Sequence, residues 1–230
     1  SSLWYSASEN NEDSTTIYID TKAPLVENET RYHNYLIHYN ETINISVDVY
    51  DENSIDKVWV MFGMPNQFIN VSTSYLSGNT YNLTSNEYSY QIGKYNATFF
   101  ANDTAGNVNS SNIIEWEVYG WSNISWVSPD DGSYPKGSVI ELTCRVLDKN
   151  LTKGIENYLV NFYYTNSSGS EFDLGSNITN SSGYATFYWD TSSLEMGIYY
   201  PKCNITDNST LYYNVTQENE ANTTINITAP

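Results

Sequence analysis

The most frequent chemically significant pattern in this sequence is Asn-x-Ser/Thr, whose asparagine amide can accept an N-linked glycan. With 30 Asn and 50 Ser and Thr in 230 residues, chance would give roughly six or seven such triplets. The sequence has eighteen, none with a central proline. The excess predicts an extracellular protein with many covalent N-glycans. The asparagines are Asn28, Asn40, Asn44, Asn70, Asn82, Asn96, Asn102, Asn109, Asn123, Asn150, Asn166, Asn177, Asn180, Asn204, Asn208, Asn214, Asn222 and Asn226.

Strand parity supports this interpretation. In ETINISVDVYD, the apolar residues from Ile43 to Val49 alternate toward one face and leave Asn44 on the other. The same alternation in KYNATFFAND leaves Asn96 and Asn102 on the outer face. A glycan needs solvent, and accidental triplets would not follow strand parity.

Patterns for other chemistry are missing from the sequence. It has no nucleophile elbow, zinc-protease motif or phosphate loop. His33 and His38 have no second ligand at metal spacing, so we expect no enzyme and no required cofactor. A net charge of −18 with only nine Lys and Arg argues against nucleic acid as a partner. Because no apolar run approaches about 18 residues, we expect no membrane span in this segment.

The elements that must position these residues are strands. Segments with alternating apolar and polar residues recur between clusters of Asn, Gly, Asp and Ser, and no helical stretch is found. About seven strands per 100 residues are typical of an immunoglobulin-like sandwich, so we predict an all-β fold of tandem immunoglobulin-like β-sandwiches. The predicted strands are 24–26, 42–50, 57–63, 67–74, 80–83, 94–102 and 113–119, followed by 123–127, 139–147, 158–164, 171–174, 185–190, 198–206 and 223–228.

Several stretches resemble known repeats. GKYNATFFANDTAGNVNSS (93–111) resembles the F strand and F–G turn of immunoglobulin-like repeats in archaeal and bacterial surface proteins, and IDTKAP (19–24) resembles their interdomain linker. SPDDGSYPKGSVIELTC followed by TNSSGYATFYWDT resembles a bacterial immunoglobulin-like module. The density of glycosylation triplets and the composition rich in Asn, Thr and Tyr are similar to archaeal cell-surface glycoproteins, including filament and S-layer-like proteins.

The resemblance gives the two cysteines a role. Counted along the second domain, Cys144 and Cys203 fall on strands B and F, which the immunoglobulin disulfide joins across the core. The alternative is two free buried thiols, but a secreted chain should oxidise them. Trp189 departs from the antibody pattern, since it falls on strand E rather than strand C.

Carboxylates are expected to meet at one pole of the first sandwich, where its entering linker and its B–C and F–G turns converge. These places carry Asp20, Asp51 and Asp103. Converging carboxylates repel unless a cation lies among them, and oxygen ligands suit Ca²⁺. The set is therefore a candidate structural Ca²⁺ site, of the kind that cadherins and some bacterial immunoglobulin-like repeats have at their linkers. The alternative is that Asp51 and Asp103 only form Asx turns.

The N-terminal segment repeats the end of the chain, because TTIYIDTKAP (15–24) is similar to TTINITAP (223–230). Residues 1–22 therefore resemble the final β-hairpin of a preceding domain, either a piece of a longer repeat array or a hairpin donated to a neighbouring subunit. We predict this extra N-terminal hairpin, a first domain at 23–120, and a second domain at 121–230 that contains the B–F disulfide.

Two functions are compatible with these observations. The first is a structural subunit of a glycosylated surface filament, sheath or array. It would polymerise head-to-tail through β-strand contacts, with copies of itself or adjacent repeats as partners. The alternative is an adhesin or carbohydrate-binding stalk module of a cell or viral surface. The 22 Tyr and six Trp favour the alternative where their rings face outward, as we expect for Trp4, Trp59, Trp116 and Trp121.

Overall fold

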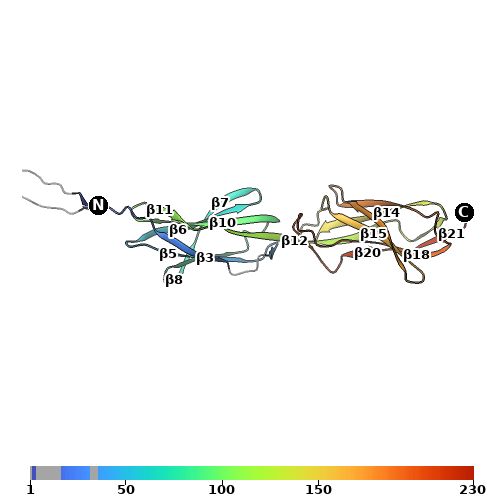
Figure 1. Ribbon diagram of the computed structural model, residues 1–230, viewed down its shortest axis with the longest axis horizontal. Helices are drawn as coiled ribbons and strands as arrows, with labels where there is room; N and C mark the ends of the chain where they lie inside the picture. The colour runs from blue at the N-terminus through green and yellow to red at the C-terminus, as the bar shows by residue number, and fades with distance from the viewer. Residues whose placement is uncertain (1, 4–16, 32–35) are drawn as a thin grey trace, which may run out of the picture. The chain divides into compact units, whose positions relative to one another are not determined.

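Every regular element in the described part of the chain is a β-strand. The computed structural model describes residues 2–3, 17–31 and 36–230 (Figure 1). It divides into a first domain, residues 1–118, and a second domain, residues 119–230. Each domain is a sandwich of two sheets, as the alternating pattern predicts. Within the described residues we find no helix that is long and apolar enough to cross a membrane.

The first domain packs two sheets against each other. The first sheet has the strand order β3 (Leu25–Arg31), β5 (Ile43–Tyr50), β9 (Thr80–Ser85) and β8 (Ser74–Ser77). The second sheet contains β7 (Gln67–Ser72), β6 (Ile55–Met64), β10 (Gly93–Asp103) and part of β12 (Ile114–Ser128), with β11 (Val108–Ser110) beside β10 and β4 (Leu36–His38) beside β12.

The core of the first domain is aliphatic and aromatic. The alternation in β5 buries Val47 and its apolar neighbours, and the alternation in β10 buries Tyr95 and Phe99. The Tyr95 ring stacks on Trp116 at 5.6 Å, and Phe62 meets Trp116 edge-on. Burial raises the pKa of Tyr95 to about 12. Aromatic packing therefore fills a core that has no disulfide.

Strand β12 differs from the prediction of two strands, 113–119 and 123–127, separated by a linker. It is one strand of 15 residues. Its residues 114–118 pair with β10 and its residues 122–128 pair with β14. The intervening Gly120–Ser122 pair in parallel with β19 (Tyr213–Val215), so the backbone groups of the expected linker have ladder partners.

The second domain has the same two-layer arrangement. One layer has the order β17 (Tyr184–Asp190), β14 (Val139–Asp148) and β12, with β19 beside β12. The other layer has the order β13 (Gly132–Pro135), β21 (Ile225–Thr228), β18 (Gly197–Asn204), β15 (Leu159–Asn166) and β16 (Glu171–Ile178), with β20 (Glu220–Asn222) beside β18.

Two glycines bring three backbone segments of the second domain into close contact. A Cβ on Gly154 would lie 2.2 Å from the Ser182 carbonyl, and a Cβ on Gly183 would lie 2.3 Å from the Val146 carbonyl oxygen. Gly183 also has a φ of +82°. The Val146 amide on β14 donates to the Gly183 carbonyl at 2.8 Å, which holds β14 against the turn before β17. Only residues without a side chain fit there.

The N-terminal segment contains a short antiparallel ladder. Strand β1 (Ser2–Leu3) pairs with β2 (Ile17–Tyr18), with Leu3 opposite Ile17. These strands form a two-stranded sheet that includes no other described strand. The turn of the predicted hairpin, residues 4–16, lies outside the described residues.

Candidate functional site

Three carboxylates converge in the first domain. Asp20 lies between β2 and β3, Asp51 follows β5, and Asp103 ends β10. One oxygen from each lies within 4.8 Å of the others. The three residues predicted from the linker and the two turns are therefore brought together. Asp103 is buried, whereas Asp20 and Asp51 are partly exposed.

Asp103 is held by neutral donors. Its Oδ1 accepts the backbone amides of Ala105 and Asn107 at 2.8 and 2.9 Å, and its Oδ2 accepts the Asn107 side-chain amide at 2.8 Å. Desolvation alone would raise the pKa of Asp103, but the bonds from Asn107 and Ala105 outweigh it, so the pKa lies below its ordinary value. The carboxylate is thus kept ionised although it is buried.

Asn53 and Asn107 link the other two carboxylates to the cluster. The Asn53 side-chain amide donates to Asp20 at 2.6 Å, and its backbone amide donates to Asp51 at 2.8 Å. The Asn107 side chain also donates to the Asp20 carbonyl at 3.2 Å. The Asx turns that we considered as the alternative are therefore present at Asp51 and Asp103. They leave further carboxylate lone pairs available for a cation, since a carboxylate offers about four acceptor sites.

The corresponding turn of the second domain holds its carboxylate differently. Asp148 is buried, and its Oδ1 accepts the amides of Asn150 and Leu151 at 2.8 and 2.9 Å. Its Oδ2 accepts the Tyr213 hydroxyl at 2.8 Å. Burial and the bond to Asp148 raise the pKa of Tyr213, so the hydroxyl remains a neutral donor. Asp207 is exposed and accepts the Val215 amide at 2.7 Å.

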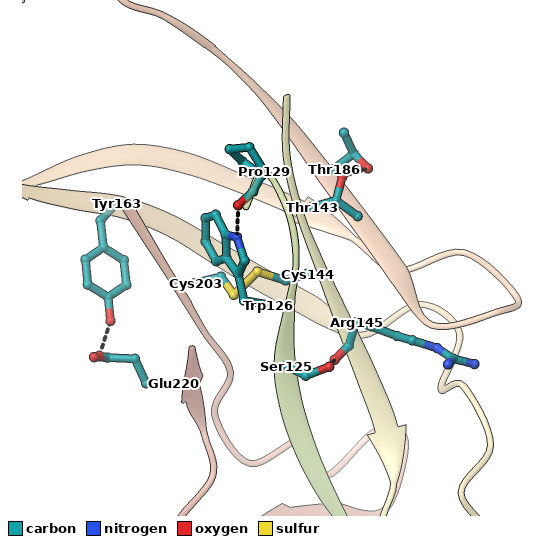
Figure 2. The surroundings of a disulfide bond; sticks show 10 residues. All are labelled: Ser125, Trp126, Pro129, Thr143, Cys144, Arg145, Tyr163, Thr186, Cys203 and Glu220. Carbon is teal, nitrogen blue, oxygen red and sulfur yellow. Dashed lines mark hydrogen bonds between the residues drawn. A yellow bond between two sulfur atoms is a disulfide. The ribbon is translucent and has the colours of Figure 1, made fainter. Parts of the chain in front are cut away.

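The two cysteines form a disulfide between the layers of the second domain. Cys144 on β14 is bonded to Cys203 on β18, 59 residues later, and neither is exposed (Figure 2). Trp126 is the cross-strand neighbour of Cys144, and its indole lies beside the bridge. The indole donates to the Pro129 carbonyl at 2.7 Å. A tryptophan on β12 thus packs at the disulfide, a position that sequence reasoning did not assign.

The glycosylation triplets lie outside both cores. None of the eighteen asparagines is buried. The exposed ones are Asn28, Asn40, Asn70, Asn109, Asn150, Asn177, Asn180, Asn222 and Asn226. The partly exposed ones are Asn44, Asn82, Asn96, Asn102, Asn123, Asn166, Asn204, Asn208 and Asn214.

The outward tryptophans are only partly as expected. Trp59 and Trp121 are partly exposed, whereas Trp4 lies outside the described residues. The prediction for Trp116 was wrong, because this side chain is 3% exposed and packs between Tyr95 and Phe62. The alternation along β12 places Trp116 on the same buried face as Val118.

The fold is similar to solved immunoglobulin-like repeats. No protein-family model matches the sequence, and no curated protein matches it. A tetra-tandem repeat from the extending region of a large adhesion protein matches with a TM-score of 0.57 and 15% identity, over 94% of this chain and 52% of that one. The present chain thus spans about half the length of that solved chain.

Two further structures are similar at lower TM-scores. The Yersinia pseudotuberculosis adhesin InvE matches with a TM-score of 0.44 and 15% identity, over 87% of this chain and 58% of that one. The ICAM-5 D1–D4 ectodomain fragment matches with a TM-score of 0.48 and 16% identity, over 89% and 54%. With its two sandwiches and its interlayer disulfide, the chain has the fold of a tandem immunoglobulin-like repeat protein.

Proposed function

We propose that the chain is an extracellular, N-glycosylated structural module of a surface filament, sheath or array. The observation that carries this proposal is the position of the eighteen glycosylation triplets, none of which has a buried asparagine. Strand alternation places these asparagines on the outer faces of the sandwiches. An attached glycan has room there. A composition that produced triplets by accident would not sort them in this way.

The disulfide supports an extracellular location. Cys144 and Cys203 are fully buried and bonded, and such bridges form and persist in oxidising compartments. The similar tandem repeat comes from the extending region of a large adhesion protein, which supports a spacer role for the present module. That likeness concerns the fold, and the role is our proposal.

We further propose that the N-terminal hairpin pairs with a neighbouring copy or repeat. The ladder of β1 and β2 stands apart from the sheets of the first domain, and a two-stranded hairpin alone is marginally stable in water. Ile19, just after β2, is 45% exposed and needs an apolar face to cover it. Addition to an open sheet edge would satisfy both requirements and join modules head-to-tail.

Peptide mapping of the native protein tests the glycosylation proposal. We expect glycan on most of the eighteen asparagines, including the neighbouring pair Asn177 and Asn180. Asn109 and Asn177 are the most demanding sites, because their side-chain amides already donate to the backbone carbonyls of Pro24 and Thr186 at 2.9 and 2.8 Å. Occupancy at fewer than about half of the triplets would contradict a glycan-coated surface module.

Deletion of residues 1–20 tests the assembly proposal. We expect the shortened protein to retain both folded domains, with an unchanged circular dichroism spectrum, and to lose head-to-tail polymers in electron micrographs. A shortened protein that still assembles would contradict strand addition through the hairpin. The undeleted chain prepared in parallel is the matched control.

An adhesin is the second candidate, and exposed aromatic rings favour it. Phe68 is 71% exposed and Tyr188 is 65% exposed, each on the outer face of a sandwich. Such rings can stack on sugars of another surface. Glycan-array binding that is lost on Phe68→Ala or Tyr188→Ala, by a protein that forms no polymers, would favour this function over the structural one.

For the carboxylate cluster we propose a divalent cation, with Ca²⁺ the best fit. Asp20, Asp51 and Asp103 supply only oxygen ligands from three separate segments, and Asp103 is buried and ionised. A cation would offset the repulsion among the carboxylates and tie the segment after β2 to the two turns. The proposed role is therefore to stiffen the entry to the first domain.

A further inference from the structure

A groove crosses the outer face of the first domain between β6, β7, β10 and β11. It has a volume of about 350 Å³ and is lined by residues that include Lys57, Trp59 and Val108. The Trp59 ring stacks on Phe100 at 5.5 Å with an interplanar angle of 12°. Lys57 places its ammonium 5.7 Å from the centre of the Trp59 ring. The groove thus offers a stacked pair of aromatic rings beside a hydrogen-bond donor.

Two glycosylation triplets form the rim of this groove. Asn70 on β7 and Asn102 on β10 both line it. Asn102 lies opposite Lys57, and Asn70 lies opposite Met61, so each partner on β6 is two residues from Trp59. These asparagines and Trp59 share the outer face, because the intervening Val58 and Val60 point into the core.

Each of these asparagines follows a phenylalanine by two residues. Phe68 precedes Asn70 and Phe100 precedes Asn102. Residues i and i+2 of a strand share a face, so each attachment point has a ring next to it on its own strand. Phe68 is 71% exposed, and the Asn102 amide donates to Asp56 at 2.9 Å, a bond that a glycosylated amide can keep with its remaining hydrogen.

We propose that this groove is the binding site for the chain's own N-glycans, with the first sugars on Asn70 and Asn102 packed against Trp59 and Phe100. The proposal rests on the proposed glycosylation. Sugar rings present C–H groups that pack on aromatic faces, and their hydroxyls are acceptors for Lys57. A tethered sugar has an effective concentration of about millimolar or more, so a weak stacking interaction is enough to occupy the groove.

The consequence is a distinct role for the exposed aromatic residues of this face. Trp59, Phe100 and Phe68 are platforms for sugars of the same molecule, and the covered face is unavailable to sugars of another surface. The glycans also shield apolar area on this outer face, where Phe68 is 71% exposed.

Radical labelling of the glycosylated full-length protein, read by mass spectrometry, tests the proposal. The comparison is with a double variant, Asn70→Gln and Thr104→Ala, which removes both triplets and leaves Trp59 and Phe100 in place. We expect Trp59 to be modified about threefold faster in the double variant, because stacking protects the ring. Thr42→Ala, which removes the triplet at Asn40 in the same domain, is the matched control and should leave Trp59 unchanged.

The outcomes separate the two proposals. Glycan found on Asn70 and Asn102 together with equal Trp59 reactivity in both proteins overturns the groove assignment and leaves the glycosylation proposal standing. Unmodified Asn70 and Asn102 overturn the groove assignment, and a lack of glycan at the other triplets overturns the proposed function as well. Both proteins made without glycosylation should show the same Trp59 reactivity, which excludes a direct effect of the substitutions.

Thermal unfolding provides a second measurement. Glycosylation at the two triplets should raise the melting temperature of the first domain by about 4 °C, the shift typical of one stacking contact in a domain of this size. In a Trp59→Ala background the same glycans should give no shift. An equal shift with and without Trp59 would show that the glycans stabilise the domain in some other way and would overturn the proposal.

Discussion

In the second domain a disulfide joins the two layers, whereas in the first domain Val47 and Phe99 lie at the corresponding positions. Cys144 lies two residues before Val146 in VLDKN, as Val47 lies two residues before Val49 in VYDEN. All four side chains at the compared positions are fully buried. At this point the fold therefore needs two buried side chains that fill the space between the layers. The second domain fills it with a disulfide, and the first domain fills it with apolar side chains.

The turns that follow β5 and β14 also differ in the groups that surround their aspartate carboxylate. Asp148 of the second domain is closed off by the Tyr213 hydroxyl, a neutral donor. Asp51 of the first domain instead lies among other carboxylates. The second domain has a self-contained turn, whereas the first domain has oxygen ligands left over for a cation.

Loss of the disulfide should give the largest difference in stability between the two domains. Replacing Cys144 and Cys203 by Ala removes a link that closes a loop of 59 residues, which should lower the free energy of unfolding of the second domain by about 4 kcal/mol. Calorimetry should show one transition shifted downward and the other unchanged. A shift of both transitions, or two free thiols in the native protein, would contradict the assignment.

A smaller effect is expected from Tyr213→Phe. The substitution leaves the buried Asp148 carboxylate without one of its three donors, at a cost of about 2 kcal/mol to the second domain. Chemical denaturation measures the loss. Tyr188→Phe is the control, since Tyr188 is 65% exposed and should leave stability unchanged. Equal stability of both variants would show that the Tyr213 hydroxyl does not stabilise the turn at Asp148.

Addition of Ca²⁺ sharpens the comparison further. At millimolar Ca²⁺ and a dissociation constant typical of extracellular modules, the first domain should gain about 1 kcal/mol, and the second domain should gain nothing. The transition that is insensitive to reducing agent is the one expected to move. Asp51→Asn should abolish the gain. A Ca²⁺-dependent shift that survives Asp51→Asn would place the cation elsewhere.

Alkaline pH tests the core of the first domain and has no effect on its stability near neutrality. The pKa of Tyr95 is raised to about 12 by burial, against about 10 in an unfolded chain. Its contribution to stability is complete below pH 10 and is lost as the pH rises through 12, because the unfolded chain releases the proton first. The first domain should therefore destabilise between pH 10 and 12, and Tyr95→Phe should reduce this dependence.

Much of this fold could be predicted from local alternation. The strands at 42–50, 94–102 and 139–147 agree with β5, β10 and β14 to within one residue at each end. In these strands one face is buried and the other is wet, so the pattern has a period of two. The three carboxylates of the first domain were predicted as a group, because all lie where loops converge.

The parts that were missed depend on contacts between distant segments. Short strands such as β19 and β20 have only three residues each and exist because a partner is nearby. The continuity of β12 depends on its pairing with β19, about 90 residues later. Trp126 beside the disulfide could have been found only with the register between β12 and β14.

The close approach at Gly154 and Gly183 has a consequence for how this sequence can change over generations. A glycosylation triplet on an exposed strand face can be gained or lost by one substitution, since its asparagine touches little of the core. Gly154 and Gly183 have no such freedom, because even a methyl group would lie about 2 Å from a backbone carbonyl. Among descendants of this chain, the number and positions of the glycosylation triplets should vary, whereas Gly154 and Gly183 should be conserved.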